Sequence, residues 1–371
     1  MSEAHVRPDE VFSREALWCA AKRATRDKGR RPSVGWFRLA LEDHLIELRD
    51  ALLGDVWRPS RPVQMRVRDP KPRTISVLPL RDRVVHQCLF PTLDARIARR
   101  LITDCYASRA GLGTHAALTR ATAWARTFRW WVRLDVRQFF PSVDHAIVRE
   151  QLARDVPEAW LRAFCERILA AGEGPSLRAH FPGDDLFAPS RRAVGLPLGS
   201  LTSQLWANRF LDPVDHLVKD RLRLRGYLRY MDDMLLFHDD RDALVDVARR
   251  VEAACAELRL RLHPWQVQPT SAGVGFVGYR ITPHQVRMRR SGVARAERRL
   301  GALAEGVRDG AVPFARYAAS LRATFGHWSH ADAWRLRERT LRRIGMLDRD
   351  GKEVGVPVAP CDGADSSGTS A

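Results

Sequence analysis

The stretch that decides the fold reads Arg229-Tyr230-Met231-Asp232-Asp233-Met234-Leu235-Leu236-Phe237. Two adjacent carboxylates lie inside a run that is otherwise apolar and aromatic, which is typical of a buried strand. Successive side chains of a strand point to opposite faces, so a tight turn over Met231 to Met234 is needed to project both acids to one side. A solvated turn is the ordinary interpretation of an isolated Asp-Asp pair, but the apolar flanks favour a divalent-cation site.

A second acidic strand end supplies the third carboxylate that such a site requires. Residues 130–136 read Trp-Trp-Val-Arg-Leu-Asp-Val and alternate as a strand does, with Arg133 and Asp135 on one face. Two aromatic residues, Phe139 and Phe140, follow four and five positions after Asp135. The sequence therefore predicts two strands that each carry acids at one end.

An Asp at the end of an apolar strand, two aromatic residues and a distant Tyr-Met-Asp-Asp together resemble the palm of reverse transcriptases. The resemblance implies that Asp135, Asp232 and Asp233 are catalytic and hold two Mg²⁺ ions, with Val136 adding a backbone carbonyl. Such ions, about 3.5–4 Å apart, activate the attacking hydroxyl and stabilise the leaving oxygen of an in-line displacement. The resemblance also implies that Phe140 stacks under the deoxyribose and excludes a 2′-hydroxyl.

The charge of the chain points to a polyanionic partner. Its 62 Lys and Arg residues against 44 Asp and Glu residues give a net charge of +18 and a pI near 10.7. The predicted catalytic site consists of acids, yet the chain as a whole is strongly basic. This suggests that Lys and Arg residues away from the site hold a nucleic acid. A generally basic composition without a specific ligand remains the alternative.

Cysteine usage and hydropathy predict a cytoplasmic protein with no membrane association. The six cysteines occur singly and without a Cys-x-x-Cys pair, at positions 19, 88, 105, 165, 255 and 361. This argues against a zinc site and a disulfide framework and suits a reducing compartment. The sequence has no apolar run of about 18 residues, and the first ten residues lack the apolar core of a signal peptide.

A basic hairpin is predicted between Val63 and Val77, where two alternating segments flank a Pro-rich turn. A surface hairpin with solvated cations is one interpretation. The Pro-Lys-x-Arg-x-Ile arrangement resembles the fingers hairpin of reverse transcriptases, which clamps the incoming triphosphate. The resemblance implies that Lys71 and Arg73 neutralise phosphate charge, for which the arginine offers a bidentate fork.

The block Gly195-Leu196-Pro197-Leu198-Gly199-Ser200-Leu201-Thr202-Ser203-Gln204 is the most informative about subfamily. A Gly-Pro-Gly loop opens a helix here and leaves free backbone N–H groups. In the family this loop packs under the templating base pair, which implies nucleotide-binding roles for Leu198, Gly199 and Gln204. Most reverse transcriptases carry Gln in place of Leu198; the Leu-Thr-Ser-Gln form resembles the bacterial enzymes of diversity-generating retroelements. An ordinary capped helix is the alternative.

Three features lie further along the chain. Gln266 stands where relatives usually carry a Lys that is thought to assist pyrophosphate departure. The segment Gly275 to Arg280 resembles the turn that grips the primer end. Helical residues 290–345 are rich in arginine and could line a duplex, as a polymerase thumb does.

The sequence predicts an α+β fold: a right-hand polymerase with an antiparallel palm sheet, fingers and a helical thumb. Residues 1–59 are expected to form a helical extension, with helices from Ser13 to about Arg26 and from Val34 to Leu53. The fingers and palm are expected over residues 60–285, and the thumb over residues 286–347. Residues 348–371 are expected to form a disordered tail.

The expected function is RNA-directed DNA synthesis in a diversity-generating retroelement. Its partners would be an RNA template, a DNA or RNA primer, dNTPs and a possible accessory protein, with Mg²⁺ as cofactor. A retron or antiphage-defence enzyme and a short group II intron relative are alternatives within the same class. A catalytically idle RNA-binding scaffold is the alternative from another class. The three mutually repelling carboxylates argue against an idle site.

Overall fold

The computed structural model describes residues 5–26, 28, 31–68, 72–172 and 179–347. The chain divides into two compact units. The first comprises Met1–Ala117 and Trp130–Val267, and the second comprises Leu118–Arg129 and Gln268–Ala371. Both units combine helices with antiparallel strands, which confirms the predicted α+β class.

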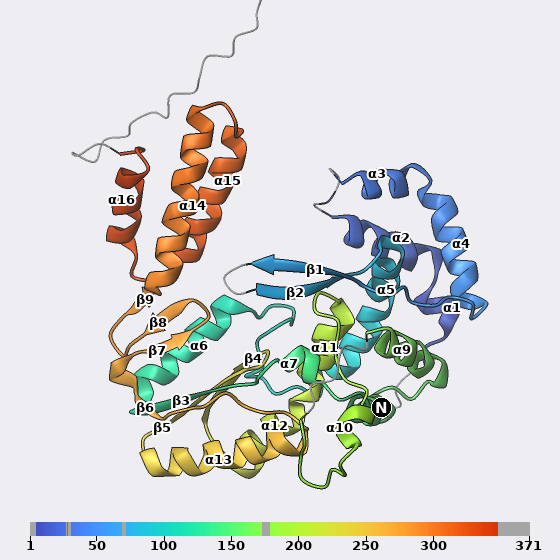
Figure 1. The fold of residues 1–371 in the computed structure, drawn as a ribbon, viewed down its shortest axis with the longest axis horizontal. Coiled ribbons are helices and arrows are strands. Elements are labelled where there is room, and N and C mark those ends of the chain that lie inside the picture. The colour runs from blue at the N-terminus through green and yellow to red at the C-terminus, as the bar shows by residue number, and fades with distance from the viewer. Residues whose placement is uncertain (1–4, 27, 29–30, 69–71, 173–178, 348–371) are drawn as a thin grey trace, which may run out of the picture. The chain divides into compact units, whose positions relative to one another are not determined.

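The central sheet of the first unit contains the two predicted acidic strands. Its strands β4 (Gly226–Tyr230), β5 (Asp233–His238) and β3 (Trp130–Asp135) lie in the order β4-β5-β3, and both pairs are antiparallel. The strands form because their apolar side chains are fully buried, among them Leu134 and Leu236. Helix α13 (Arg241–Glu257) covers one face of β3 and β5 (Figure 1) and begins at Asp240, whose side chain caps two backbone N–H groups.

The strand register places the turn of the acidic hairpin one residue earlier than predicted. Tyr230 pairs with Asp233, so Met231 and Asp232 alone form the loop and Asp233 belongs to β5. Met231 has a φ of +59°, the left-handed conformation that a two-residue hairpin loop demands. The apolar pattern did not reveal this, because methionine has no preference for positive φ.

The first unit also contains the following helices in its described residues. Those that precede the central sheet are α1 (Pro8–Val11), α2 (Arg14–Thr25), α3 (Pro32–Leu39), α4 (Leu41–Leu53) and α5 (Leu80–Ile97). Those that follow β3 are α7 (Phe139–Ser142), α8 (His145–Asp155), α9 (Ala159–Ala171), α10 (Ala188–Arg191), α11 (Leu201–Phe210) and α12 (Asp212–His216), with a π-helical turn at Leu217–Arg221.

The N-terminal helices agree in part with the prediction. Ser13 caps α2 as expected, since its side chain accepts a hydrogen bond from the N–H of Ala16. The single helix predicted from Val34 to Leu53 is wrong. It is two helices, because Ala40 leaves the helical conformation at φ −120° and ψ 43°.

The predicted basic hairpin is present as β1 (Val63–Arg68) and β2 (Pro72–Val77), paired from Val63↔Val77 to Arg68↔Pro72. The N–H of Ser76 donates to the carbonyl of Leu198 at 2.8 Å, which joins the hairpin to the loop before α11. Lys71 and the side chain of Arg73 lie outside the described residues.

A buried arginine on β4 joins the sheet to the helices around it. Arg229 is fully buried and forms an ion pair with Asp215 of α12, Nη2 to Oδ2 at 2.6 Å. Its Nη1 donates to Asn208 Oδ1 at 3.1 Å and to the carbonyl of Met231 at 3.0 Å. The Tyr227 hydroxyl donates a hydrogen bond to the Asp215 carboxylate at 2.6 Å. The hairpin loop that carries Asp232 is therefore tied to the core through this guanidinium.

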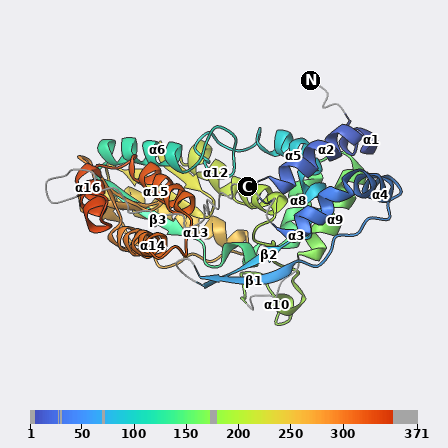
Figure 2. The ribbon, with the colours of Figure 1, turned by 90° about the horizontal axis from the view of Figure 1, so that it is seen from above.

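The described residues of the second unit form a small sheet and several helices. Strands β7 (Val274–Phe276), β8 (Tyr279–Ile281) and β9 (Val286–Met288) are antiparallel in that order. Helices α14 (Arg290–Arg308) and α15 (Phe314–Trp328) lie side by side (Figure 2) around the buried Leu300 and Tyr317. The unit also includes α16 (Trp334–Arg343), the short strand β6 (Gln268–Pro269), a 3₁₀ turn at Thr270–Ala272 and most of α6 (Thr114–Thr127).

The described part of the chain has neither a membrane-spanning helix nor a disulfide. None of its helices combines the length and the apolar character that crossing a bilayer would require. The five cysteines within it, at positions 19, 88, 105, 165 and 255, form no disulfide.

We predict that Arg229→Met destabilises the protein by about 3–5 kcal/mol, because the buried Asp215 loses its counter-charge. Urea denaturation at pH 7 measures this change. Arg250→Ala is the matched control, since Arg250 pairs with Asp246 at 2.9 Å with both side chains 59% exposed, and exposed pairs contribute about 0–1 kcal/mol. Equal effects of the two substitutions would contradict the role given to Arg229.

Candidate active site

The three predicted carboxylates lie at adjoining strand ends in the first unit. Asp135, the last residue of β3, is the register partner of Asp233, the first residue of β5. Asp232 precedes it in the hairpin loop. The side chain of Asp135 is 37% exposed and that of Asp233 is 14% exposed. The acids therefore stand at the rim of the sheet, partly open to solvent.

A guanidinium lies between two of these acids. Nε of Arg133 donates to Asp233 Oδ1 at 2.7 Å, and its Nη2 lies 3.9 Å from Asp135 Oδ1. The predicted strand alternation put Arg133 on the same face as Asp135, but assigned it no role. The structure shows that this arginine is a counter-charge for the acidic pair.

The acids fit a hard divalent cation in their chemistry. Carboxylate oxygens are the ligands that Mg²⁺ prefers. The pKa of Asp233 is raised to about 7, mainly by burial; Asp135 and Asp232 contribute to the increase, and Arg133 opposes it. A cation bound here would lower the free-energy cost of ionising the Asp233 carboxylate. However, no group of three or more acidic, His or Cys side chains in the described ranges stands close enough together to hold an ion. The described arrangement thus brings the acids to one rim without gathering them into a ligand set.

The backbone of Val136 is free to face the hairpin loop. Val136 forms an isolated antiparallel bridge with Leu262, and its neighbours make the hydrogen bonds: His263 N–H to the Asp135 carbonyl, and Arg137 N–H to the Arg261 carbonyl, each 2.8 Å. Backbone groups alternate sides along an antiparallel strand. The carbonyl of Val136 therefore points away from Leu262, toward the side on which β5 and its loop lie.

Phe140 lies beside the loop that precedes α11. Its ring is half-buried in α7 and meets Phe139 edge-on at 5.6 Å, while Phe139 packs into the core. The Phe140 carbonyl accepts a hydrogen bond from the N–H of Leu196 at 2.8 Å. The structure thus brings Phe140 and the Gly195–Gly199 loop together.

That loop holds Leu198 half-buried and Gly199 exposed. Gly199 has a φ of +108°, and a Cβ there would lie 3.1 Å from the Ser76 carbonyl oxygen and 3.2 Å from Ile75 Cγ2. Glycine is therefore required by both conformation and space. Gln204, one turn into α11, accepts a hydrogen bond from the Ser108 hydroxyl at 3.0 Å.

A buried histidine that the sequence did not single out anchors the start of α11. His86 Nδ1 lies 2.9 Å from Thr202 Oγ1 and 3.1 Å from Ser200 Oγ. Burial lowers the pKa of His86 to about 4, so the ring is neutral at physiological pH. It links α5 to the loop that carries Leu198 and Gly199.

Gln266 and the turn predicted to grip the primer end lie in different units of the chain. Gln266 is exposed on the segment that follows α13. In the second unit, Val277 and Gly278 form the β7–β8 turn with φ values of +39° and +93°. A positive φ is costly for a β-branched residue, so this turn is strained.

The residues that sequence reasoning missed are mainly cations inside apolar strands. Arg229 and Arg133 both interrupt strand patterns that are otherwise buried, and that interruption was the available signal. A charged residue amid buried neighbours requires a partner, but the identity of the partner depends on tertiary contacts.

An antiparallel sheet with acids at its paired strand ends is an arrangement compatible with a polymerase. The family described as reverse transcriptase (RNA-dependent DNA polymerase) matches residues 66–281, more than half of the 371-residue chain. The chain therefore belongs to the reverse transcriptase family, whose members are nucleotidyltransferases that copy RNA into DNA.

Two curated relatives are similar at low identity. The chain is 23% identical over 286 residues to Protein YkfC of Escherichia coli K12, covering 66% of this chain and 72% of YkfC. It is 23% identical over 168 residues to the putative COX1/OXI3 intron 1 protein of Saccharomyces cerevisiae, covering 44% of this chain. The match spans only 19% of the length of that yeast protein.

Telomerase structures are among the similar solved structures. Apo telomerase from Candida tropicalis has a TM-score of 0.47 and 9% identity, covering 77% of this chain and 62% of that one. Telomerase from Candida albicans with a fragment of telomeric RNA has a TM-score of 0.46 and 10% identity, covering 78% and 55%.

We predict that Asp233→Asn stabilises the metal-free protein at pH 8 and much less at pH 5. The folded-state pKa of about 7 exceeds the usual value of 3.8, so the folded state binds the proton more tightly. Stability is therefore lost as pH rises through this window, and the cost is complete above pH 7. Asparagine removes the cost at high pH.

Urea denaturation in EDTA at both pH values measures the effect. Asp242→Asn, at a side chain that is 91% exposed, serves as the control and should change stability by less than about 0.5 kcal/mol. A less stable Asp233→Asn protein at pH 8 would show that the carboxylate is not destabilised in the folded state.

Proposed function

We propose that the chain is an RNA-directed DNA polymerase that makes cDNA by two-metal nucleotidyl transfer. The observation that carries the proposal is the pairing of Asp135 with Asp233 at adjoining strand ends, with Asp232 in the connecting loop. These residues lie within the segment that matches the reverse transcriptase family. Family membership and acid placement support the same chemistry.

The acids would act as ligands rather than as proton carriers. Asp135, Asp232 and Asp233 would hold Mg²⁺, and the Val136 carbonyl would add an oxygen from the side facing the loop. When bound, Mg²⁺ lowers the pKa of the attacking hydroxyl and neutralises charge on the leaving oxygen. Arg133 would have to release the carboxylates that it bridges. Arg229 keeps the loop in place throughout, through the Met231 carbonyl.

We infer the substrate-binding residues from the resemblance to the family, and the arrangement of the described ones supports them. Phe140 would lie under the sugar of the incoming dNTP and exclude a 2′-hydroxyl by its bulk. Leu198, Gly199 and Gln204 would face the nascent base pair. Lys71 and Arg73 would clamp the triphosphate from the hairpin, which is joined to the Leu198 loop through Ser76.

The template and primer would be held by cationic surfaces away from the acids. The net charge of +18 supports a nucleic-acid ligand. We assign fingers and palm to residues 60–285 and the thumb to 286–347, where arginines of α14 would follow the duplex. An RNA template, a DNA or RNA primer and a possible accessory protein complete the proposed partners, and the cytoplasm is the proposed location.

The proposed context is a diversity-generating retroelement. Leu198 and the Ser203-Gln204 pair support this subfamily, because most reverse transcriptases carry Gln in the place of Leu198. A retron enzyme, an antiphage-defence enzyme and a group II intron relative share the proposed chemistry. A template repeat and a variable target gene beside the coding sequence would distinguish a diversity-generating retroelement from these three alternatives.

We predict that Asp135→Asn and Asp232→Asn each abolish primer extension while leaving RNA affinity within about twofold. The reason is that the acids act on the reacting groups, whereas the basic surfaces hold the nucleic acid. Extension of a DNA primer on an RNA template with Mg²⁺ and dNTPs measures the first quantity, and fluorescence anisotropy measures the second.

Asp242→Asn is the control and should extend primers as the wild type does. Wild-type rates in either active-site variant would remove the catalytic assignment. A wild-type protein that binds RNA but never extends a primer would instead indicate an idle scaffold.

We predict errors concentrated at template adenine, reduced by Leu198→Gln. A Gln side chain can hydrogen-bond near the nascent pair, whereas Leu offers only bulk, and apolar contacts discriminate by only about 1–3 kcal/mol. Sequencing the cDNA made by both proteins on one RNA measures the spectra. If Leu198 only packs against the loop, the substitution lowers activity without changing the spectrum. An even, low error spectrum in the wild type would remove the subfamily assignment.

A further inference from the structure

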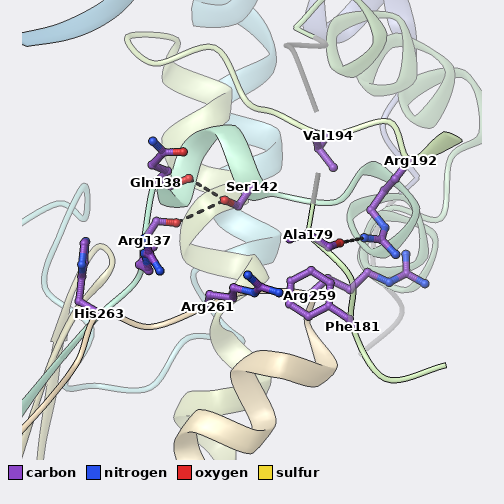
Figure 3. A pocket seen from close by; sticks show the side chains of 10 residues that line it. All are labelled: Arg137, Gln138, Ser142, Ala179, Phe181, Arg192, Val194, Arg259, Arg261 and His263. Atoms are coloured by element: carbon purple, nitrogen blue, oxygen red, sulfur yellow. Dashed lines mark hydrogen bonds between the residues drawn. The ribbon is translucent and has the colours of Figure 1, made fainter. Parts of the chain in front are cut away.

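A cationic cavity of about 300 Å³ opens in the first unit beside the end of β3 (Figure 3). Four arginines and a histidine contribute to its wall: Arg137, Arg192, Arg259, Arg261 and His263. They come from the segment after β3, the loop before α11 and the segment after α13. Phosphate groups are the ligands that clustered guanidinium groups recognise best.

Two of these arginines are already neutralised. Arg259 Nη1 lies 2.6 Å from Asp144 Oδ2, and Arg192 Nε lies 3.2 Å from the same oxygen. Arg192 also forms an ion pair with Asp184. These two arginines therefore act mainly as the structural wall of the cavity.

The other two arginines carry uncompensated charge. Arg261 Nη2 donates to the His180 carbonyl at 3.2 Å, and its guanidinium lies 5.6 Å from the centre of the Phe181 ring (Figure 3). Over the part of the chain that the structure describes, neither Arg137 nor Arg261 has a carboxylate partner. Both are exposed, so an anion can reach them.

Backbone pairing places these cations next to the proposed catalytic acid. The Val136↔Leu262 bridge puts Arg137 opposite Arg261, and His263 opposite Asp135. Side chains alternate along paired strands. Asp135, Arg137, Arg261 and His263 therefore lie on one face of this strand pair.

The backbone of the cavity wall is strained at two positions. Gln138 has φ +48° and ψ +49°, and Arg259 has φ +57°. The left-handed conformation is unfavourable for residues with a Cβ, and retained strain of this kind clusters at functional sites. Such strain at two residues of one wall accords with a binding role.

We propose that this cavity binds the pyrophosphate released during nucleotide addition, with Arg137 and Arg261 as its main ligands. The proposal rests on the proposed polymerase function. The 3′-oxygen of the primer forms a bond to the α-phosphorus and loses its proton to solvent. The bond from the α-phosphorus to the bridging oxygen breaks, and its electron pair leaves with pyrophosphate.

Gln266, on the same segment as Arg261, is neutral and exposed, so under this proposal the positive charge that the leaving group meets comes from Arg137 and Arg261. Within the described residues, the guanidinium groups of Arg137 and Arg261 have no carboxylate partner. Arg261 lies on the segment after α13 that also carries Gln266, and Arg137 lies just after β3. The leaving pyrophosphate gains negative charge as the bond breaks, and bidentate guanidinium groups stabilise such charge.

The test measures pyrophosphate binding to the full-length protein in EDTA without nucleic acid, by isothermal titration calorimetry. We expect the double variant Arg137→Ala/Arg261→Ala to bind pyrophosphate at least tenfold more weakly than the wild type. Arg154→Ala/Arg250→Ala removes the same charge from exposed ion pairs and should bind within twofold of the wild type. Thermal unfolding checks that both variants are folded. Equal binding by the wild type and the cavity variant, or equal losses in both variants, would overturn the proposal.

Inhibition of primer extension by pyrophosphate gives a second readout. We expect the inhibition constant to rise at least tenfold in the cavity variant, and Gln266→Lys added to that variant to lower it again. Loss of affinity for single-stranded RNA with unchanged pyrophosphate affinity would assign the cavity to a nucleic-acid backbone and overturn the proposal.

The two proposals fail in different ways. A wild type that extends primers but shows the same pyrophosphate inhibition as the cavity variant would overturn the inference and leave the polymerase standing. A wild type that binds pyrophosphate through these arginines but never extends a primer would leave the anion site standing and remove the polymerase.

Discussion

The buried ion pair between Arg229 and Asp215 is the interaction on which the acidic hairpin depends. It is fully desolvated, and the same guanidinium holds the carbonyl of Met231, whose own backbone is in the left-handed conformation. A buried pair of this kind gains little over apolar packing, but breaking it is expensive. Its value here is positional: it fixes the residue before Asp232 against the core, so the loop does not depend on its own weak conformational preference.

The site is built from acids that repel one another, and cations around them make this tolerable. Arg133 bridges Asp135 and Asp233, but burial still raises the pKa of Asp233, so the guanidinium offsets only part of the cost of charging this carboxylate. Beyond Asp135 the charge changes sign: Arg137 lies just after β3, and Arg261 lies opposite it on the segment after α13. One face of the strand pair thus carries Arg133, then Asp135, and then the two arginines that we propose bind pyrophosphate. This order suits a reaction that brings in a polyphosphate and releases its leaving group.

The sequence was informative where a period or an uncommon residue type decided the structure. Strand alternation located β3, the apolar run after the acidic pair located β5, and two alternating segments around a Pro-rich basic turn located the β1–β2 hairpin. It failed at the register of the acidic turn, because Met231 adopts a positive φ that its side chain does not announce. The sequence also did not reveal the roles of Arg133 and Arg229, because each depends on a carboxylate that only the fold brings near. Arg133 pairs with Asp233, which is 100 residues away in sequence. Arg229 pairs with Asp215 of α12.

The central claim is that Asp135, Asp232 and Asp233 hold divalent metal ions during nucleotide addition. Its most direct test counts Mn²⁺ bound to the protein with RNA template, a 3′-deoxy primer and dNTP, by electron paramagnetic resonance of the free ion. The account predicts that the wild type binds Mn²⁺ in this complex, that Asp135→Asn loses it and that the exposed Asp246→Asn does not. Equal Mn²⁺ binding by the wild type and Asp135→Asn would contradict the account.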